Sequence, residues 1–182
     1  MLRICAGKFK GKRLKLPPLT IVRPSSNKLR QAIFNILGNL VSLQNLRVLD
    51  AFAGSGALGL EAISRGAAQV TFCENNPLVK GVLEDNILSI GPSISNQVSC
   101  VPDIFRLLCN QPFNLIFLDP PYDKELEIKA IQYLDKQKLI APEGFVIIEQ
   151  RKGAKIPECA GFVTHPPRIY GQCQITFLCA LK

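Results

Sequence analysis

Acidic residues are missing from the first 47 residues of the chain, which contain ten Lys or Arg and no Asp or Glu. The rest of the chain holds twelve basic and fourteen acidic residues, so the net charge of +8 comes from the N-terminal quarter. Such a segment is typical of a surface that binds a polyanion, because each phosphate contact releases counterions. The alternative is a solvated basic face that serves only solubility.

Several patterns that define other protein classes are also absent. The seven cysteines include no C-x-x-C pair, so we expect neither a disulfide framework nor a bound metal. The single histidine, His165, precedes two prolines and has no catalytic partner nearby in the sequence. No run approaches the roughly 20 apolar residues of a membrane span, and the first residues are too basic for a signal peptide. We therefore expect a soluble cytoplasmic protein with no membrane partner.

The chain is long enough for one domain with a sizeable core, and strands alternate with helices along most of it. The N-terminal residues predict a short hairpin, and the residues from Ser25 or Ser26 to Leu40 predict a helix. Further helices are predicted at 57–65, 77–90, 103–109 and 124–136, and strands at 46–52, 69–74, 97–101, 113–119 and 144–150. A last pair of strands surrounds Tyr170 and Gly171. We predict one α/β domain with a mostly parallel sheet, divided into a basic hairpin extension (1–22) and a core (23–182).

Glycines follow the first core strand in the stretch "LDAFAGSGALGLE". Gly54, Gly56 and Gly59 form a G-x-G-x-x-G pattern between a strand and a helix. Glycines at these positions permit a tight turn and a close approach of the backbone to a ligand, with helix amides facing it. The pattern alone is weak evidence, because dinucleotide-binding folds share it.

Acidic residues end four successive predicted strands, at Asp50, Glu74, Asp103 and Asp119. In a parallel sheet these ends meet at one edge, where ligands bind. Glu74 follows the glycines by about 20 residues, where a carboxylate can accept both hydroxyls of a ribose. Asp103 could accept from an adenine amino group. Any one of these acids could instead cap a helix, but four in succession favour a binding site.

The stretch "FNLIFLDPPYDKE" ends a buried strand in Asp119, Pro120, Pro121 and Tyr122. A nucleobase amine is a poor nucleophile, because its lone pair is conjugated with the ring. If the Asp119 carboxylate and the Pro120 carbonyl accept the amine hydrogens, the lone pair can face an electrophilic methyl group. Tyr122 can stack on a base that has left its helix. The alternative is that two prolines simply stop the strand.

The runs "VLDAFAGSGALGLEAISRGA" and "LDPPY" resemble motifs I and IV of class I S-adenosylmethionine-dependent methyltransferases that act on amino nitrogens. Together with "RICAGKFKGKRLKLP", "RPSSNKLRQAIFNIL" and "IYGQCQITFL", they resemble the RsmD-type family of bacterial 16S rRNA (guanine(966)-N2)-methyltransferases over nearly the whole chain. The resemblance implies a Rossmann-like sheet of seven strands with a reversed last strand. It also implies S-adenosylmethionine as cofactor, and 16S rRNA or the small-subunit particle as partner of a monomeric enzyme.

The resemblance assigns roles to individual residues. Asp50, Phe52, Gly54 and Gly56 would line the methionine end of the cofactor, Glu74 would hold the ribose, and Asp103 would hold the adenine. Asp119, Pro120, Pro121 and Tyr122 would hold the target guanine, with Asp119 also bordering the cofactor. The residues expected to contact RNA are Arg3, Lys8, Lys10, Lys12, Arg13, Lys15, Arg23 and Arg30.

Other functions remain open from the sequence. D-P-P-Y also occurs in DNA methyltransferases that modify N6 of adenine or N4 of cytosine, although 182 residues leave no room for a separate sequence-recognition domain. A non-catalytic RNA-binding protein that kept this fold is a third reading, against which the intact glycine loop argues. A nicotinamide-dependent oxidoreductase is least favoured, because it would leave the Asp119–Tyr122 stretch unexplained.

Overall fold

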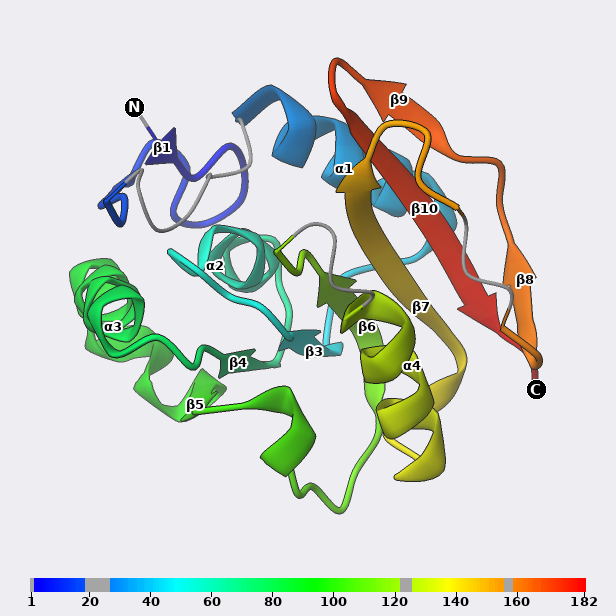
Figure 1. Ribbon diagram of the computed structural model, residues 1–182. Helices are drawn as coiled ribbons and strands as arrows, with labels where there is room; N and C mark the ends of the chain where they lie inside the picture. Colours follow the sequence, from blue (N-terminus) through cyan, green and yellow to red (C-terminus); the bar gives the residue numbers. More distant parts are fainter. Residues whose placement is uncertain (1, 19–26, 122–125, 156–158) are drawn as a thin grey trace.

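The computed structural model describes residues 2–18, 27–121, 126–155 and 159–182, and its centre is a mixed sheet (Figure 1). The strand order is β5-β4-β3-β6-β7-β10-β8. The five parallel strands are β3 (Arg47–Asp50), β4 (Gln69–Cys73), β5 (Val98–Val101), β6 (Phe113–Leu118) and β7 (Ile140–Arg151). β10 (Cys173–Ala180) runs antiparallel to β7. The predicted α/β fold, with a mostly parallel sheet and a reversed last strand, is confirmed.

The number of strands in the described residues differs from the predicted seven, and the difference lies at the outer edge of β10. Two short strands, β8 (Phe162–Thr164) and β9 (Arg168–Tyr170), share this edge and pair with opposite ends of β10. Pro166 and Pro167 lie between them, and proline cannot donate a hydrogen bond to a sheet ladder. The sheet of the described residues therefore has eight strands, because two of them divide the outermost position.

Helices cover both faces of the sheet, and each face has its own apolar core. Successive residues of a strand point to opposite faces, so Val48 belongs to one core and Leu49 to the other. The first core packs under α1 (Asn27–Leu40), α2 (Ala57–Ser64) and α3 (Pro77–Ile90). The second packs under α4 (Leu126–Lys136). The nearly unbroken apolar strands are explained by this burial on two sides.

The helix predicted at 103–109 is wrong, because only the 3-10 turn η2 (Ile104–Arg106) forms there. Leu107 already has an extended conformation (φ −68°, ψ 115°). Its carbonyl accepts a hydrogen bond from the Tyr133 hydroxyl of α4 at 3.0 Å. A seven-residue segment gains too few intrahelical bonds to outweigh the cost of nucleation, so tertiary contacts decide its shape. A second 3-10 turn, η1 (Pro92–Gln97), precedes β5.

The N-terminal segment is fastened to the core by backbone hydrogen bonds. Its hairpin consists of β1 (Leu2–Arg3) and β2 (Arg13–Leu14), whose leucines pack into the core under α1. The Cys5 and Ala6 amides donate to the two carboxylate oxygens of Glu61 in α2, at 2.7 and 3.0 Å. The segment therefore has a fixed place on α2. No helix in the described part of the chain is both long and apolar enough to cross a membrane.

Candidate active site

A cavity of about 860 Å³ lies at the C-terminal ends of the parallel strands. The chain runs from β3 outward to β4 and β5, then returns to the other side of β3 with β6 and β7, so the strand order reverses beside β3. Ligands of open α/β sheets bind at this kind of reversal, and the volume lies within the usual range of ligand sites. Pro17 of the N-terminal segment and Tyr170 of β9 also line the cavity.

The glycine loop after β3 forms one wall of this cavity. Gly54 and Gly56 have φ values of 54° and 79°, in the left-handed region that favours glycine. A Cβ on Gly56 would lie 2.4 Å from Leu83 Cδ1 of α3, and a Cβ on Gly59 would lie 2.3 Å from Phe72 Cε1 of β4. Because Gly56 and Gly59 have no side chains, α2 packs closely against α3 and β4. This packing positions the glycine loop beside the cavity.

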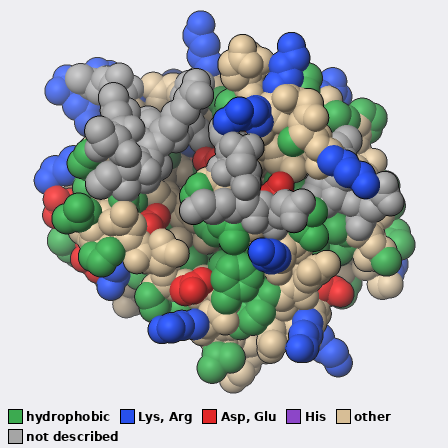
Figure 2. Space-filling view, in the orientation of Figure 1, with side chains coloured by type: hydrophobic (Ala, Val, Ile, Leu, Met, Phe, Trp, Pro, Cys, Tyr) green, Lys and Arg blue, Asp and Glu red, His purple; other side chains and the backbone are tan. Residues whose placement is uncertain are grey.

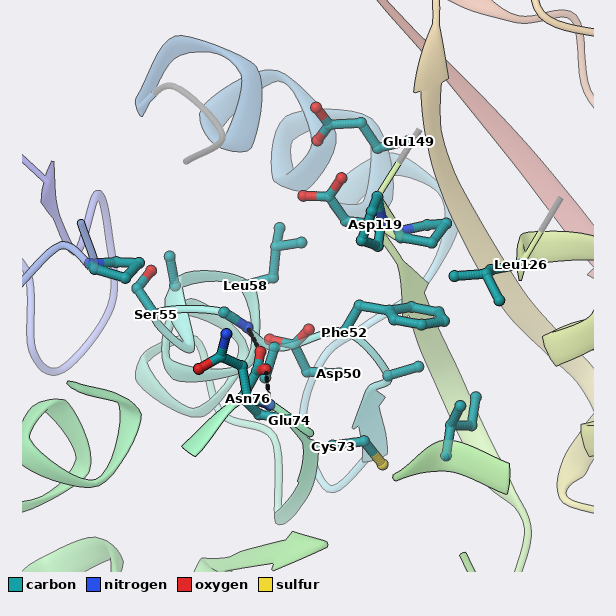
Figure 3. Close-up of a pocket in the computed structure, with 18 of the residues that line it drawn as sticks. Asp50, Phe52, Ser55, Leu58, Cys73, Glu74, Asn76, Asp119, Leu126 and Glu149 are labelled. Carbon is teal, nitrogen blue, oxygen red and sulfur yellow. Dashed lines mark hydrogen bonds between the residues drawn. The ribbon is translucent and has the colours of Figure 1, made fainter. Parts of the chain in front are cut away.

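Glu74 joins the glycine loop to the end of β4. Its Oε2 accepts the Gly54 amide and its Oε1 accepts the Asn76 amide, both at 2.9 Å (Figure 3). Asn76 in turn caps α3 by accepting from the Leu78 amide. Each carboxylate oxygen can accept more than one hydrogen bond, so Glu74 is held in place and can still bind the hydroxyls of a ligand.

Asp50 is almost fully buried at the end of β3, where its Oδ2 accepts the Gly59 amide at 2.9 Å. The pKa of Asp50 is raised from 3.8 to about 7, mainly by burial; the Gly59 amide opposes this rise and the nearby Glu74 charge adds to it. Burial and the surrounding carboxylates likewise raise the pKa of the Cys73 thiol to about 12. Cys73 is therefore a neutral thiol that packs against the cavity, as expected of a core residue.

Asp103 and Phe52 border the same cavity. Asp103 caps η2 by accepting the Phe105 amide at 3.0 Å, so the capping role considered from the sequence is present. That bond leaves lone pairs of the carboxylate available to a ligand. Phe52 lies between the Asp50–Glu74 pair and Asp119 in Figure 3.

Asp119, Pro120 and Pro121 line the cavity directly after β6, and Figure 3 shows Asp119 across the cavity from Glu74. The structure therefore brings together all four predicted strand-end acids around one cavity. Tyr122 lies outside the described residues.

Glu149 was missed by the sequence analysis, although it also lines the cavity. It is 6% exposed and lies near the end of β7. Figure 3 shows its carboxylate beside that of Asp119, with both pointing in the same direction. The signal that identified the other acids, a carboxylate at the end of an apolar strand, was present in "GFVIIEQ".

The basic N-terminal residues mostly lie where an RNA could reach them. Arg3, Lys8, Lys10, Lys12, Arg13 and Lys15 are exposed, and Figure 2 shows basic side chains at the upper left, where Figure 1 places β1, as well as elsewhere on this face. The Lys15 ammonium pairs with Asp85 of α3 at 2.8 Å. Arg23 lies outside the described residues.

Arg30 requires a correction, because its side chain is completely buried. Its Nε lies 3.5 Å from Oε2 of the equally buried Glu61, and its Nη2 donates to the Arg3 carbonyl and to Asn27. Glu61 also pairs with Arg65 at 2.8 Å. Arg30 thus joins α1, α2 and the N-terminal segment, and we remove it from the residues expected to contact RNA.

The donor set of the cavity fits an organic ligand with hydroxyl and amino groups. Its polar groups include carboxylates, backbone amides and the side-chain amides of Asn75, Asn76 and Gln172, which suit the ribose, adenine and amino-acid parts of a nucleoside cofactor. Among the described residues, no three His, Cys, Asp or Glu side chains form a group that could hold a metal ion.

Known proteins match the chain over nearly its full length. A family model described as "conserved hypothetical protein 95" matches residues 2–179. Ribosomal RNA small subunit methyltransferase D of Buchnera aphidicola is 34% identical over 176 residues, covering 94% of this chain and 89% of that protein. The protein of the same name from Escherichia coli is 31% identical over 172 residues, covering 94% and 86%.

Solved structures agree with this result. A candidate methyltransferase of Escherichia coli superposes with a TM-score of 0.86 at 28% identity, covering 99% of this chain and 98% of that one. A candidate methylase of Haemophilus influenzae gives a TM-score of 0.81 at 28% identity, covering 100% and 99%.

Proposed function

The chain belongs to the family described as conserved hypothetical protein 95, and on this premise we propose that it transfers a methyl group from S-adenosylmethionine to the N2 amine of a guanine in 16S rRNA. Its relatives named ribosomal RNA small subunit methyltransferase D support this proposal. The observation that carries it is Asp119-Pro120-Pro121 at the end of β6, across one cavity from the Glu74-bound glycine loop.

The loop side of the cavity is the proposed cofactor site. Glu74 would accept from the ribose hydroxyls, and Asp103 from the adenine amine. Asp50, Phe52, Gly54 and Gly56 would surround the methionine part, where the ionised form of Asp50 favours positive charge. When bound, S-adenosylmethionine supplies an electrophilic methyl group on a positively charged sulfur.

The proposed chemistry at β6 consists mainly of alignment. The Asp119 carboxylate and the Pro120 carbonyl would accept the two hydrogens of the guanine N2 amine. The nitrogen lone pair would then point toward the methyl group, and the restricted backbone of Pro120 and Pro121 would keep the acceptors in position. As the nitrogen takes the methyl group and neutral S-adenosylhomocysteine is released, the Asp119 carboxylate would accept the proton that the nitrogen loses. The target base must be unstacked to reach this depth, and Tyr122 would stack on it.

The exposed basic side chains of the N-terminal segment would bind RNA phosphates beside the cavity. They are Arg3, Lys8, Lys10, Lys12, Arg13 and Lys15, with Arg23 as a further contact. Because residues 5 and 6 are bonded to Glu61, the segment would present its charges in a fixed orientation. We propose a single catalytic domain that acts as a cytoplasmic monomer on rRNA or on a small-subunit particle.

The test is transfer of labelled methyl from S-adenosylmethionine to 16S rRNA and to small-subunit particles that lack the modification, followed by nucleoside analysis. Recovery of N2-methylguanosine is expected. Label in N6-methyl-2′-deoxyadenosine or N4-methyl-2′-deoxycytidine from duplex DNA would favour a DNA methyltransferase instead. A protein that binds the cofactor but labels none of these substrates would contradict the proposed substrate.

A further inference from the structure

Glu149 stands beside Asp119 on the same face of the sheet. β6 and β7 pair in parallel with Phe117 opposite Ile147 and Leu118 opposite Ile148, so the next pair in register is Asp119 and Glu149. Phe117 and Ile147 both belong to the core under α1. Because side chains alternate between faces, Asp119 and Glu149 two residues later point to that face as well. Figure 3 agrees, since both carboxylates point the same way.

Two carboxylates on neighbouring strands repel each other, and a ligand that donates hydrogen bonds to both offsets this repulsion. Adjacent strands lie about 4.8 Å apart, and like charges on neighbouring strands repel each other. Glu149 is almost fully buried, so water screens its charge poorly. Each carboxylate has about four lone-pair sites, so both can accept from a ligand in addition to their protein partners. The pair therefore favours a ligand with two adjacent N–H donors.

Guanine is the standard base with this arrangement on its Watson–Crick edge. Its N1–H and its N2 amine are neighbouring donors, whereas N1 of adenine and N3 of cytosine are acceptors whose lone pairs a carboxylate would repel. A protein reads an unstacked base through hydrogen bonds to this edge. Two acids at the ends of β6 and β7 thus complement guanine and oppose adenine and cytosine.

We infer that Glu149 determines the base specificity of the site by accepting a hydrogen bond from guanine N1–H while Asp119 holds the N2 amine. This inference rests on the proposed function and deepens it. It gives the two acids separate roles. Asp119 aligns the reacting N2 nitrogen, and Glu149 distinguishes a base whose N1 carries a hydrogen from one whose N1 does not.

The test compares guanine with 2-aminopurine at the target position of 16S rRNA reconstituted into small-subunit particles. 2-Aminopurine keeps the amine, but its N1 carries a lone pair instead of a hydrogen. The wild-type protein should prefer guanine by about 100-fold in kcat/KM, since a site built for a donor rejects an analogue that lacks it. In Glu149→Gln the amide can donate to N1 of 2-aminopurine, so the preference should fall by at least about tenfold.

Three variants separate specificity from stability. Glu84→Gln, which removes an exposed acid on α3, should leave the preference unchanged. Glu149→Asp retains the charge and should lower guanine turnover while keeping the discrimination. Should Glu149→Gln fail to bind S-adenosylmethionine, Glu149→Ala provides the same comparison, because loss of the carboxylate also removes the repulsion.

The outcomes distinguish the inference from the proposed function. Wild-type methylation of guanine with an unchanged preference in Glu149→Gln and Glu149→Ala would overturn the role of Glu149 alone. Equal wild-type rates on guanine and 2-aminopurine would also overturn it. Failure of the wild-type protein to methylate either particle would overturn the proposed function and the inference together.

Discussion

The Glu74 carboxylate accepts the backbone amide of Gly54 at 2.9 Å, although 20 residues separate them in sequence. This bond connects the end of β4 to the loop after β3, so one carboxylate both shapes the glycine loop and faces the cavity. We therefore expect loop geometry and cofactor affinity to be coupled through Glu74.

Glu74→Gln should weaken binding of S-adenosylmethionine by about 10- to 100-fold, because the amide replaces one acceptor oxygen by a donor that faces a backbone N–H. Titration calorimetry with the cofactor measures the loss. Glu84→Gln, an exposed acid on α3, is the matched control and should bind normally. Unchanged affinity in Glu74→Gln would remove Glu74 from the cofactor site.

Asp119→Ala should abolish methyl transfer while leaving cofactor affinity within about twofold, because Asp119 is assigned to align the amine. Asp119→Asn retains the size of the side chain and should still lower turnover by about 100-fold or more. Single-turnover assays with labelled cofactor measure both variants. Asp135→Asn on the exposed side of α4 should match the wild type. Retained turnover in Asp119→Ala would refute the role of Asp119.

The Asp50 carboxyl should make stability fall with increasing pH. In the unfolded chain it loses its proton near pH 3.8, but in the folded protein only near pH 7, so the folded state binds more protons between these values. The protonated Asp50 carboxyl makes its full contribution to the free energy of unfolding below about pH 3.8, and this contribution is lost as the pH rises to about 7. The total loss is about 4 kcal/mol.

Urea unfolding of wild type and Asp50→Asn across pH 4 to 8, roughly the interval of the Asp50 transition, isolates this contribution from those of other groups. The free-energy difference between the two proteins should change with pH in this interval. A constant difference would contradict the raised pKa of Asp50.

Arg30→Ala should lower the free energy of unfolding by about 3 kcal/mol or more, because it leaves the buried Glu61 charge without its Arg30 partner. Thermal or urea denaturation measures this loss. Arg13 is exposed, so Arg13→Ala should have the opposite effect: weaker RNA binding with little change in stability. A stable Arg30→Ala protein with reduced RNA affinity would reinstate the interpretation made from sequence.

Replacing Lys8, Lys10 and Lys12 together by Gln should weaken RNA binding and reduce the slope of log K against log salt concentration by about 2 to 3, one for each lost phosphate contact. Filter binding across a salt series measures the slope, and cofactor affinity should not change. The control replaces three exposed lysines on α4 and in the turn after it, Lys129, Lys136 and Lys138. An equal loss in both variants would indicate a non-specific effect of net charge.

The sequence by itself determined the fold class and most of the candidate site. Strand and helix periodicity are local properties, and a parallel sheet necessarily brings the ends of its strands to one edge. Asp50, Glu74, Asp103 and Asp119 could therefore be grouped without knowledge of the strand order. The match of α3 to the predicted limits 77–90 has the same origin, because Asn76 and Pro77 are start signals that act locally.

Only the tertiary structure decided the fate of residues whose partners are distant in the sequence. Arg30 looked like a surface cation until Glu61, on another helix, placed it in the interior. Residues 107–109 left the helical path because Tyr133 of α4 binds the Leu107 carbonyl. Glu149 acquired its significance from the β6–β7 register that sets it beside Asp119. The physical reason is common to all three: burial and pairing energies depend on which elements meet, and no local pattern encodes that.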